Sequence, residues 1–224
     1  MKPVSERACD GEPVVRVSGA SYVRGGYRSF EFADLSVRAG EVVALLGGEA
    51  RAPRDLLLAI AGAVRPTSGS VTAPRTVGLG VFSDVADVDG TSTVEEAVAR
   101  ELRGPDAADV LAYLARYNLA THADQRVGRL DALARARLSI ALAFAGGPEA
   151  VVVDLRDPFC YGLTAAEERD VVRELRRVAR ATGTAVAVAC AESASCEAAD
   201  AVFPLDIAAT EALSHKTVLE GADA

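Results

Sequence analysis

Lysine is almost absent from this chain of 224 residues, and no stretch of it is rich in basic side chains. Lys2 and Lys216 are the only lysines, and the formal net charge is -8. Proteins that bind nucleic acids do so through clustered lysines and arginines. The composition therefore argues against a nucleic acid as the main partner.

Long apolar runs are missing as well. The longest, Leu56–Val64 and Leu138–Ala145, fall well short of the ~18 residues expected of a membrane-spanning helix. We expect both runs to be buried helices and expect no direct insertion into a membrane. The segment Met1–Gly11 has no apolar centre, so we do not expect it to be a secretory signal.

Cysteine pairs of the C-x-x-C type are also absent. The chain has four widely spaced cysteines: Cys9, Cys160, Cys190 and Cys196. For a chain of this size, this pattern predicts reduced thiols in a cytosolic setting and no metal site.

A continuous apolar run of strand length is present at Val42–Leu46, and further buried strands are predicted at Ala150–Asp154 and Thr184–Ala189. Such runs are typical of strands buried on both faces of a parallel sheet. A long amphipathic helix is predicted at Thr164–Thr182, and a last short strand at Ala201–Leu205. Strands that alternate with helices predict an open α/β sheet.

Extended segments are also predicted outside these runs: Val14–Ser18, residues 30–37, Ser70–Thr72 and Val77–Phe82. A helix is expected to start at Pro53, where the missing N–H costs nothing, and to end at Gly62.

Residues 83–140 have helical patterns without a clear strand, and we interpret them as a helical subdomain inserted into the α/β unit. The helices are expected at Val94–Arg103, Ala107–Tyr117 and Asp131–Phe144. The predicted organisation is a disordered lead-in (1–12), an α/β core (13–82 and 141–208), the helical subdomain (83–140) and a C-terminal tail (209–224).

The stretch Ala39–Val71, AGEVVALLGGEARAPRDLLLAIAGAVRPTSGSV, strongly resembles the ATP-binding subunit of ABC transporters. Val127–Asp154 resembles the signature helix and Walker B strand of that family, and Thr184–Leu205 its closing strands. The resemblance covers about residues 14–206. It implies a P-loop NTPase-type, mostly parallel sheet with an N-terminal antiparallel β part and a helical subdomain insert.

The stretch that matches the Walker A loop, G-x-x-x-x-G-K-[ST], is GGEARAPR at residues 47–54. Ala52 replaces the second glycine, Pro53 the lysine that neutralises the phosphates, and Arg54 the hydroxyl residue that binds magnesium. Alanine disfavours a positive φ, and proline removes a backbone donor. The resemblance therefore predicts a degenerate Walker A.

Some phosphate-facing groups remain in this loop. Gly47 and Gly48 match backbone positions of the motif, and Arg51 or Arg54 are candidate phosphate contacts, whereas Glu49 adds negative charge. The alternative for both arginines is a solvated position on a surface loop.

The Walker B strand should end in Asp and then Glu, which serve magnesium and the attacking water. Asp154 is present, but Leu155 stands at the Glu position. A shifted register would offer Asp157, just before Pro158, as the acid; the spacing from Arg137 favours Asp154. Asp154 is either a magnesium contact or a strand-end carboxylate that caps nearby backbone.

Other motifs of the family are also altered. Leu130–Ala134 stands at the signature L-S-G-G-Q, where Asp131 suits a helix N-cap better than an anion site. The family's Q-loop glutamine should lie near Ser83 or Asp84, but the one glutamine is Gln125.

The switch histidine should lie near Ala191, yet the two histidines are His122 and His215. The D-loop aspartate falls near Thr164. Tyr22 or Tyr27 could stack on adenine, with packing as the alternative.

Three functions stay open. The first is a degenerate ATP-binding subunit that pairs with a competent ATPase subunit, a transmembrane permease, or both. The second is a non-catalytic interaction or regulatory module, and the third an ATPase that works through Arg51, Arg54 and Asp157. We expect impaired or absent hydrolysis and no bound cofactor, with ATP and magnesium as the alternative. A homodimer is possible, and the expected location is cytoplasmic, at the inner membrane face through a permease.

Overall fold

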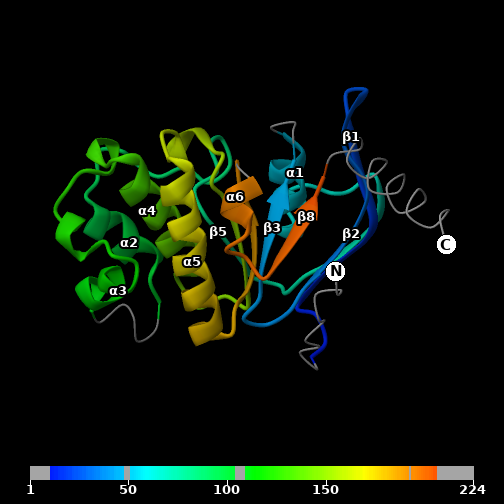
Figure 1. Cartoon of the computed structure of the whole chain (residues 1–224). Helices are drawn as coiled ribbons and strands as arrows, with labels where there is room; N and C mark the ends of the chain where they lie inside the picture. The colour runs from blue at the N-terminus through cyan, green and yellow to red at the C-terminus, as the bar shows by residue number, and fades with distance from the viewer. Residues whose placement is uncertain (1–10, 48–50, 104–108, 192, 206–224) are drawn as a thin grey trace, which may run out of the picture.

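A computed structural model describes residues 11–47, 51–103, 109–191 and 193–205 of the chain. Figure 1 shows a central sheet with the helices α2, α3 and α4 gathered on one side and the strands β1 and β2 on the other. Residues 1–10 of the predicted lead-in (1–12) and the whole predicted tail (209–224) lie outside the described residues.

The central sheet has the strand order β5-β6-β7-β3-β8, and every neighbouring pair in it is parallel. Its strands are β3 (Val42–Leu46), β5 (Val77–Leu79), β6 (Ala150–Asp154), β7 (Ala185–Ala189) and β8 (Ala201–Pro204). All residues of β6 and β7 are buried, as predicted; β7 is apolar throughout, and β6 is apolar up to its last residue, Asp154. The prediction of a mostly parallel α/β sheet is confirmed.

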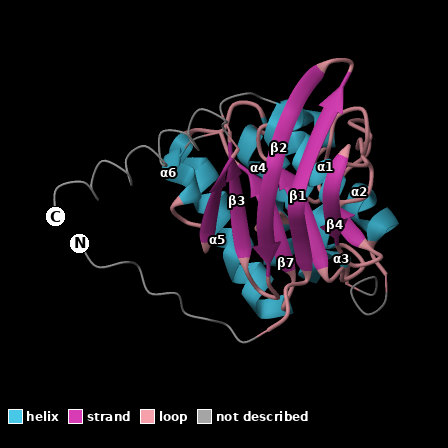
Figure 2. Cartoon of the chain, turned by 90° about the vertical axis from the view of Figure 1, so that its right-hand side faces the viewer, coloured by secondary structure: helices cyan, strands magenta, loops and turns pink. Residues whose placement is uncertain are grey.

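A second sheet is antiparallel, with the order β2-β1-β4, and Figure 2 shows its strands side by side. It consists of β1 (Val15–Arg24), β2 (Tyr27–Val37) and β4 (Ser68–Thr72). Strand β1 continues past Ser18, where the predicted strand ends, because register shifts around Gly19 and Ala20 break its alternation without ending its pairing.

Helices α1 to α5 lie close to the predicted positions: α1 (Arg51–Ile60), α2 (Val94–Glu101), α3 (Val110–Arg116), α4 (Ala132–Phe144) and α5 (Ala165–Thr182). The short helix α6 (Ser193–Cys196) is not among the predicted helices. Short 3₁₀ turns are present at Ala120–His122, Val127–Arg129 and Pro158–Cys160. Helix α1 begins before Pro53, and it ends before Gly62, whose φ of 74° cannot continue a right-handed helix. The run Leu56–Val64 is therefore only partly helical.

Alternate residues of the central strands point into two separate hydrophobic clusters. Val151 and Val153 of β6 face a cluster of buried residues from α4, α5 and the helical insert, here called the helix-side cluster. Ala150 and Val152 of the same strand face a cluster formed with α1, β1 and β2. This period of two places the sheet between the helical side and the antiparallel sheet. Within the described ranges, no helix is long and apolar enough to cross a membrane.

Candidate functional site

Three segments meet at the carboxyl end of the central strands. They are the first turn of α1, which follows β3, the loop after β6, and the residues that follow β5 near Ser83. In open α/β sheets, ligands bind outside this end of the strands. This is also the region in which the sequence places the Walker A and Walker B positions.

Arg54 joins the three segments. Its Nη1 lies 2.5 Å from Oδ2 of Asp157 and 3.7 Å from Oδ2 of Asp154, and its Nη2 donates a hydrogen bond to the carbonyl of Ser83. The guanidinium also stands over the ring of Phe82, 5.4 Å from the ring centroid. These residues form the Arg54 network: Arg54, Ser83, Asp154 and Asp157.

Asp157 is the second centre of the Arg54 network, with a side chain that is fully buried. The backbone N–H and the hydroxyl of Ser83 donate to its carboxylate at 2.9 and 2.6 Å, and the backbone N–H of Phe159 donates at 2.9 Å. Burial raises the pKa of Asp157, but these hydrogen bonds and the one from Arg54 outweigh it and hold the pKa below its usual value. Asp157 is therefore ionised at neutral pH and balances Arg54.

The alternative of a solvated position is wrong for Arg54, whose side chain is only 21% exposed. A surface loop would leave the guanidinium in water, whereas the first turn of α1 turns it toward two buried carboxylates. Arg51, three residues earlier in the same helix, is exposed.

Asp154, at the end of β6, is buried, and its Oδ1 accepts a hydrogen bond of 3.0 Å from the backbone N–H of Arg156. This contact fits the interpretation of Asp154 as a strand-end carboxylate that caps nearby backbone. The side chain of Arg156 reaches back and donates to the carbonyl of Gly47 at 2.7 Å. The loops after β3 and β6 are thus tied to each other by a second arginine.

Burial raises the pKa of Asp154 to about 6, although Arg54 and Arg156 oppose the shift and Asp157 adds to it. Relative to the ordinary value of 3.8, ionisation between the two values favours the unfolded chain, so this contribution to stability is present below 3.8 and is lost as pH rises through about 6. We expect Asp154→Asn to remove that loss, which amounts to about 3 kcal/mol at most. Urea titrations of both proteins at about pH 4.5 and about pH 7.5 measure it. A stability difference that is the same at both pH values contradicts this prediction.

Leu155 and Ala191 occupy the positions where the resemblance places a catalytic Glu and a histidine. Leu155 is 3% exposed and belongs to the helix-side cluster. Ala191 is exposed, and its backbone N–H donates to Oε1 of the buried Glu168 at 2.7 Å. Helix α5, which carries Glu168, thereby anchors the segment after β7.

Other expected site residues have structural contacts. Asp131 is the N-cap of α4 and accepts from the backbone N–H of Ala134 at 2.8 Å, as predicted. Gly47 is buried, while Gly48 lies outside the described residues. The ring of Tyr22, on β1, lies 6.2 Å from the ring of Phe30, which fits packing.

Sequence reasoning missed the role of Arg156 and the pairing of Arg54. No motif contains Arg156, so nothing in the sequence identifies its contact with Gly47. A signal for Arg54 does exist, because a cation stands at a position that should bind a metal while Asp154 and Asp157 remain opposite it. Linking these residues requires knowing that α1 lies against β6.

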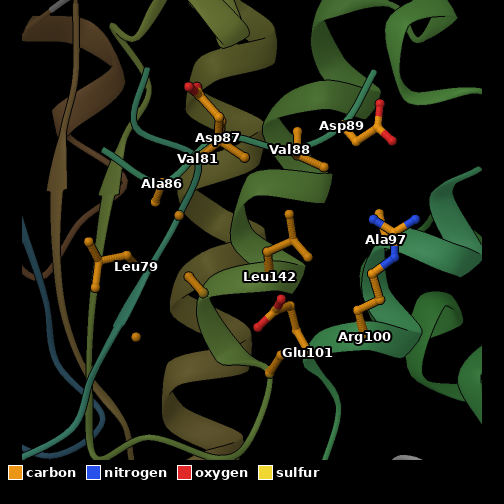
Figure 3. A pocket seen from close by; sticks show the side chains of 14 residues that line it. Leu79, Val81, Ala86, Asp87, Val88, Asp89, Ala97, Arg100, Glu101 and Leu142 are labelled. Atoms are coloured by element: carbon orange, nitrogen blue, oxygen red, sulfur yellow. The ribbon is translucent and has the colours of Figure 1, made fainter. Parts of the chain in front are cut away.

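A separate cleft of about 430 Å³ lies between β5, the segment after it and helices α2 and α4 (Figure 3). Its charged residues are three carboxylates, Asp87, Asp89 and Glu101, and one arginine, Arg100. Excess negative charge repels phosphate groups, so this cleft does not suit a nucleotide. No member of the Arg54 network lines it.

No model of a protein family matches the chain. Among curated proteins, the zinc import ATP-binding protein ZnuC of Roseobacter denitrificans is 29% identical over 176 residues, which cover 77% of this chain and 67% of that protein. An uncharacterized ABC transporter ATP-binding protein of Mycobacterium tuberculosis is 33% identical over 141 residues, 59% of this chain. The match spans only 20% of that mycobacterial protein.

Solved structures share the fold. CbiO1 of Clostridium perfringens, part of an ABC transporter complex, matches with a TM-score of 0.70 and 18% identity over 95% of both chains. A dimeric bacterial ABC transporter cassette matches with a TM-score of 0.67 and 16% identity over 86% of this chain and 94% of that chain. The chain thus shares the fold of ATP-binding cassettes of ABC transporters and is similar in sequence to ATP-binding proteins of such transporters.

Proposed function

We propose that the chain is an ABC-type ATP-binding subunit with a degenerate nucleotide site, which does not hydrolyse ATP by itself. It acts with a competent ATP-binding subunit, a transmembrane permease, or both. The burial of Leu155 directly after Asp154 is the observation that carries this proposal.

Hydrolysis needs a side chain that orients the attacking water next to the metal-binding carboxylate. Leu155 can neither accept a proton nor orient water, and its side chain is turned into the helix-side cluster. Asp157 is the other carboxylate nearby, but Arg54 and Ser83 already occupy both of its oxygens. A buried carboxylate held in this way and with a lowered pKa is a poor general base.

The proposal of a partner rests on relatives rather than on a contact in this chain. Similar structures include a dimeric cassette and a member of a transporter complex. An arrangement of the same kind would let a competent subunit supply the chemistry that this chain lacks. Similar proteins serve different cargo, zinc in one case and aliphatic sulfonates in another, so the similarity does not identify a transported substrate.

We expect the purified chain to show no magnesium-dependent ATP turnover and no binding of a fluorescent ATP analogue up to millimolar concentration. The measurement is a titration with and without magnesium, followed by a phosphate-release assay. The control is Arg54→Ala, because an ATPase that works through Arg54 would lose its turnover in this variant. Micromolar binding together with turnover that Arg54→Ala abolishes contradicts the proposed function.

A further inference from the structure

The guanidinium of Arg54 is surrounded by oxygen atoms, as a bound metal ion would be. It stands in the first turn of α1, at the position that binds magnesium through a hydroxyl in a Walker A motif. Its guanidinium contacts Asp154 at the end of β6, Asp157 in the following loop and the carbonyl of Ser83. All three partners supply oxygen atoms, which are the ligands that magnesium prefers.

The residues of this region do not fit magnesium. The ion needs near-octahedral oxygen ligands at about 2.0–2.1 Å. Here the guanidinium lies 2.5 Å from Asp157 and 3.7 Å from Asp154, so a divalent ion between the carboxylates would meet a fixed positive charge. In the described part of the chain, no group of three or more His, Cys, Asp or Glu residues could hold a metal.

We propose that Arg54 is a built-in cation that replaces magnesium and holds α1, the end of β6 and the Ser83 segment together without metal or nucleotide. An arginine stays charged at every physiological pH, and its planar fork can bind two partners at once. The connection therefore does not depend on the concentration of any ligand. This inference rests on the proposed function only in taking the region as a former nucleotide site.

A second contact supports a permanently tied site. Arg156 Nη1 donates to the carbonyl of Gly47 at 2.7 Å, which links the loop after β3 to the loop after β6. Two arginines from opposite sides of the site thus bind acceptors on the facing segment. Neither link uses a bound ligand.

The test removes the built-in cation and offers a metal in its place. Arg54→Ser leaves Asp154 and Asp157 without their guanidinium and restores a hydroxyl at the position. In metal-free buffer we expect the melting temperature of this variant to fall by about 5–10 °C. We expect Mn²⁺, followed by the loss of its free-ion EPR signal, to bind the variant at one site and to raise its melting temperature. The unmodified chain should neither bind Mn²⁺ nor change its melting temperature with it.

Two controls separate this result from general loss of charge. Arg51→Ser removes an exposed arginine from the same turn and should not create a Mn²⁺ site. Arg54→Ser combined with Asp157→Asn removes one of the two carboxylates and should abolish the Mn²⁺ site of the single variant. If Arg54→Ser does not fold, Arg54→Lys keeps a cation and should stay folded without binding Mn²⁺.

Stoichiometric Mn²⁺ binding by the unmodified chain overturns the proposal, as does an Arg54→Ser variant with an unchanged melting temperature and no Mn²⁺ site. ATP turnover measured on the same samples distinguishes this failure from that of the proposed function. Turnover without Mn²⁺ binding contradicts the proposed function alone. Mn²⁺ binding to the unmodified chain without turnover contradicts the built-in cation alone.

Discussion

Leu155→Glu is expected to destabilise the chain strongly and to leave it without ATPase activity, although it introduces the residue that the resemblance to ABC ATP-binding subunits predicts at this position. Leu155 is 3% exposed and packs in the helix-side cluster, so the substitution loses apolar burial and places a carboxyl group among hydrophobic side chains. The two effects together cost about 3–5 kcal/mol of the free energy of unfolding. Hydrolysis does not return, because the Arg54 network is unchanged.

Urea unfolding and a phosphate-release assay on the same preparation measure both parts of this prediction. Burial raises the pKa of the introduced carboxyl, so the loss of stability should grow as pH rises above its ordinary value of about 4.3. The matched control is Leu155→Met, which nearly conserves volume and should cost less than about 1.5 kcal/mol. A Leu155→Glu variant with an unchanged urea midpoint and measurable turnover would show that this position can face the site.

The central sheet was predictable because consecutive apolar residues in its strands indicate burial on both faces. β7 is apolar throughout and β6 is apolar up to Asp154, a pattern typical of a strand that is covered on both faces. β1 was predicted only in part, since the shifts of register at Gly19 and Ala20 interrupt a period of two. A bulge is decided by contacts with the neighbouring strands, which local alternation does not contain.

The Arg54 network shows the corresponding limit for the site. Motif comparison judges each position against one expected residue, and by that measure Arg54 is simply a lost hydroxyl. The structural role of Arg54 can be recognised only together with its partners. One of them, Asp157, is 103 positions away along the chain. Asp131 was predictable as an N-cap, because a cap depends on the three residues that follow it.

Gly69, the second residue of β4, has a role that concerns backbone packing. Its φ is +72°, and a Cβ atom added to it would lie 2.3 Å from the carbonyl oxygen of Gly19 and 2.6 Å from Cα of Ala20. Both neighbours are backbone atoms of β1 at the point where its pairing with β4 shifts register. Glycine is therefore required twice, for conformation and for the close approach of β4 to β1.

We expect Gly69→Ala to lower the free energy of unfolding by about 3–4 kcal/mol, the sum of a left-handed alanine and a clash that only backbone movement relieves. Gly62→Ala is the matched control, because Gly62 has a φ of +74° but nothing within 4 Å of an added Cβ. This control should cost about 1 kcal/mol, so the difference between the two variants in urea unfolding isolates the packing between β1 and β4. Equal losses would mean that β1 and β4 separate without cost. The larger loss at Gly69 would instead show that this glycine is needed for the packing of the antiparallel sheet, independently of any nucleotide.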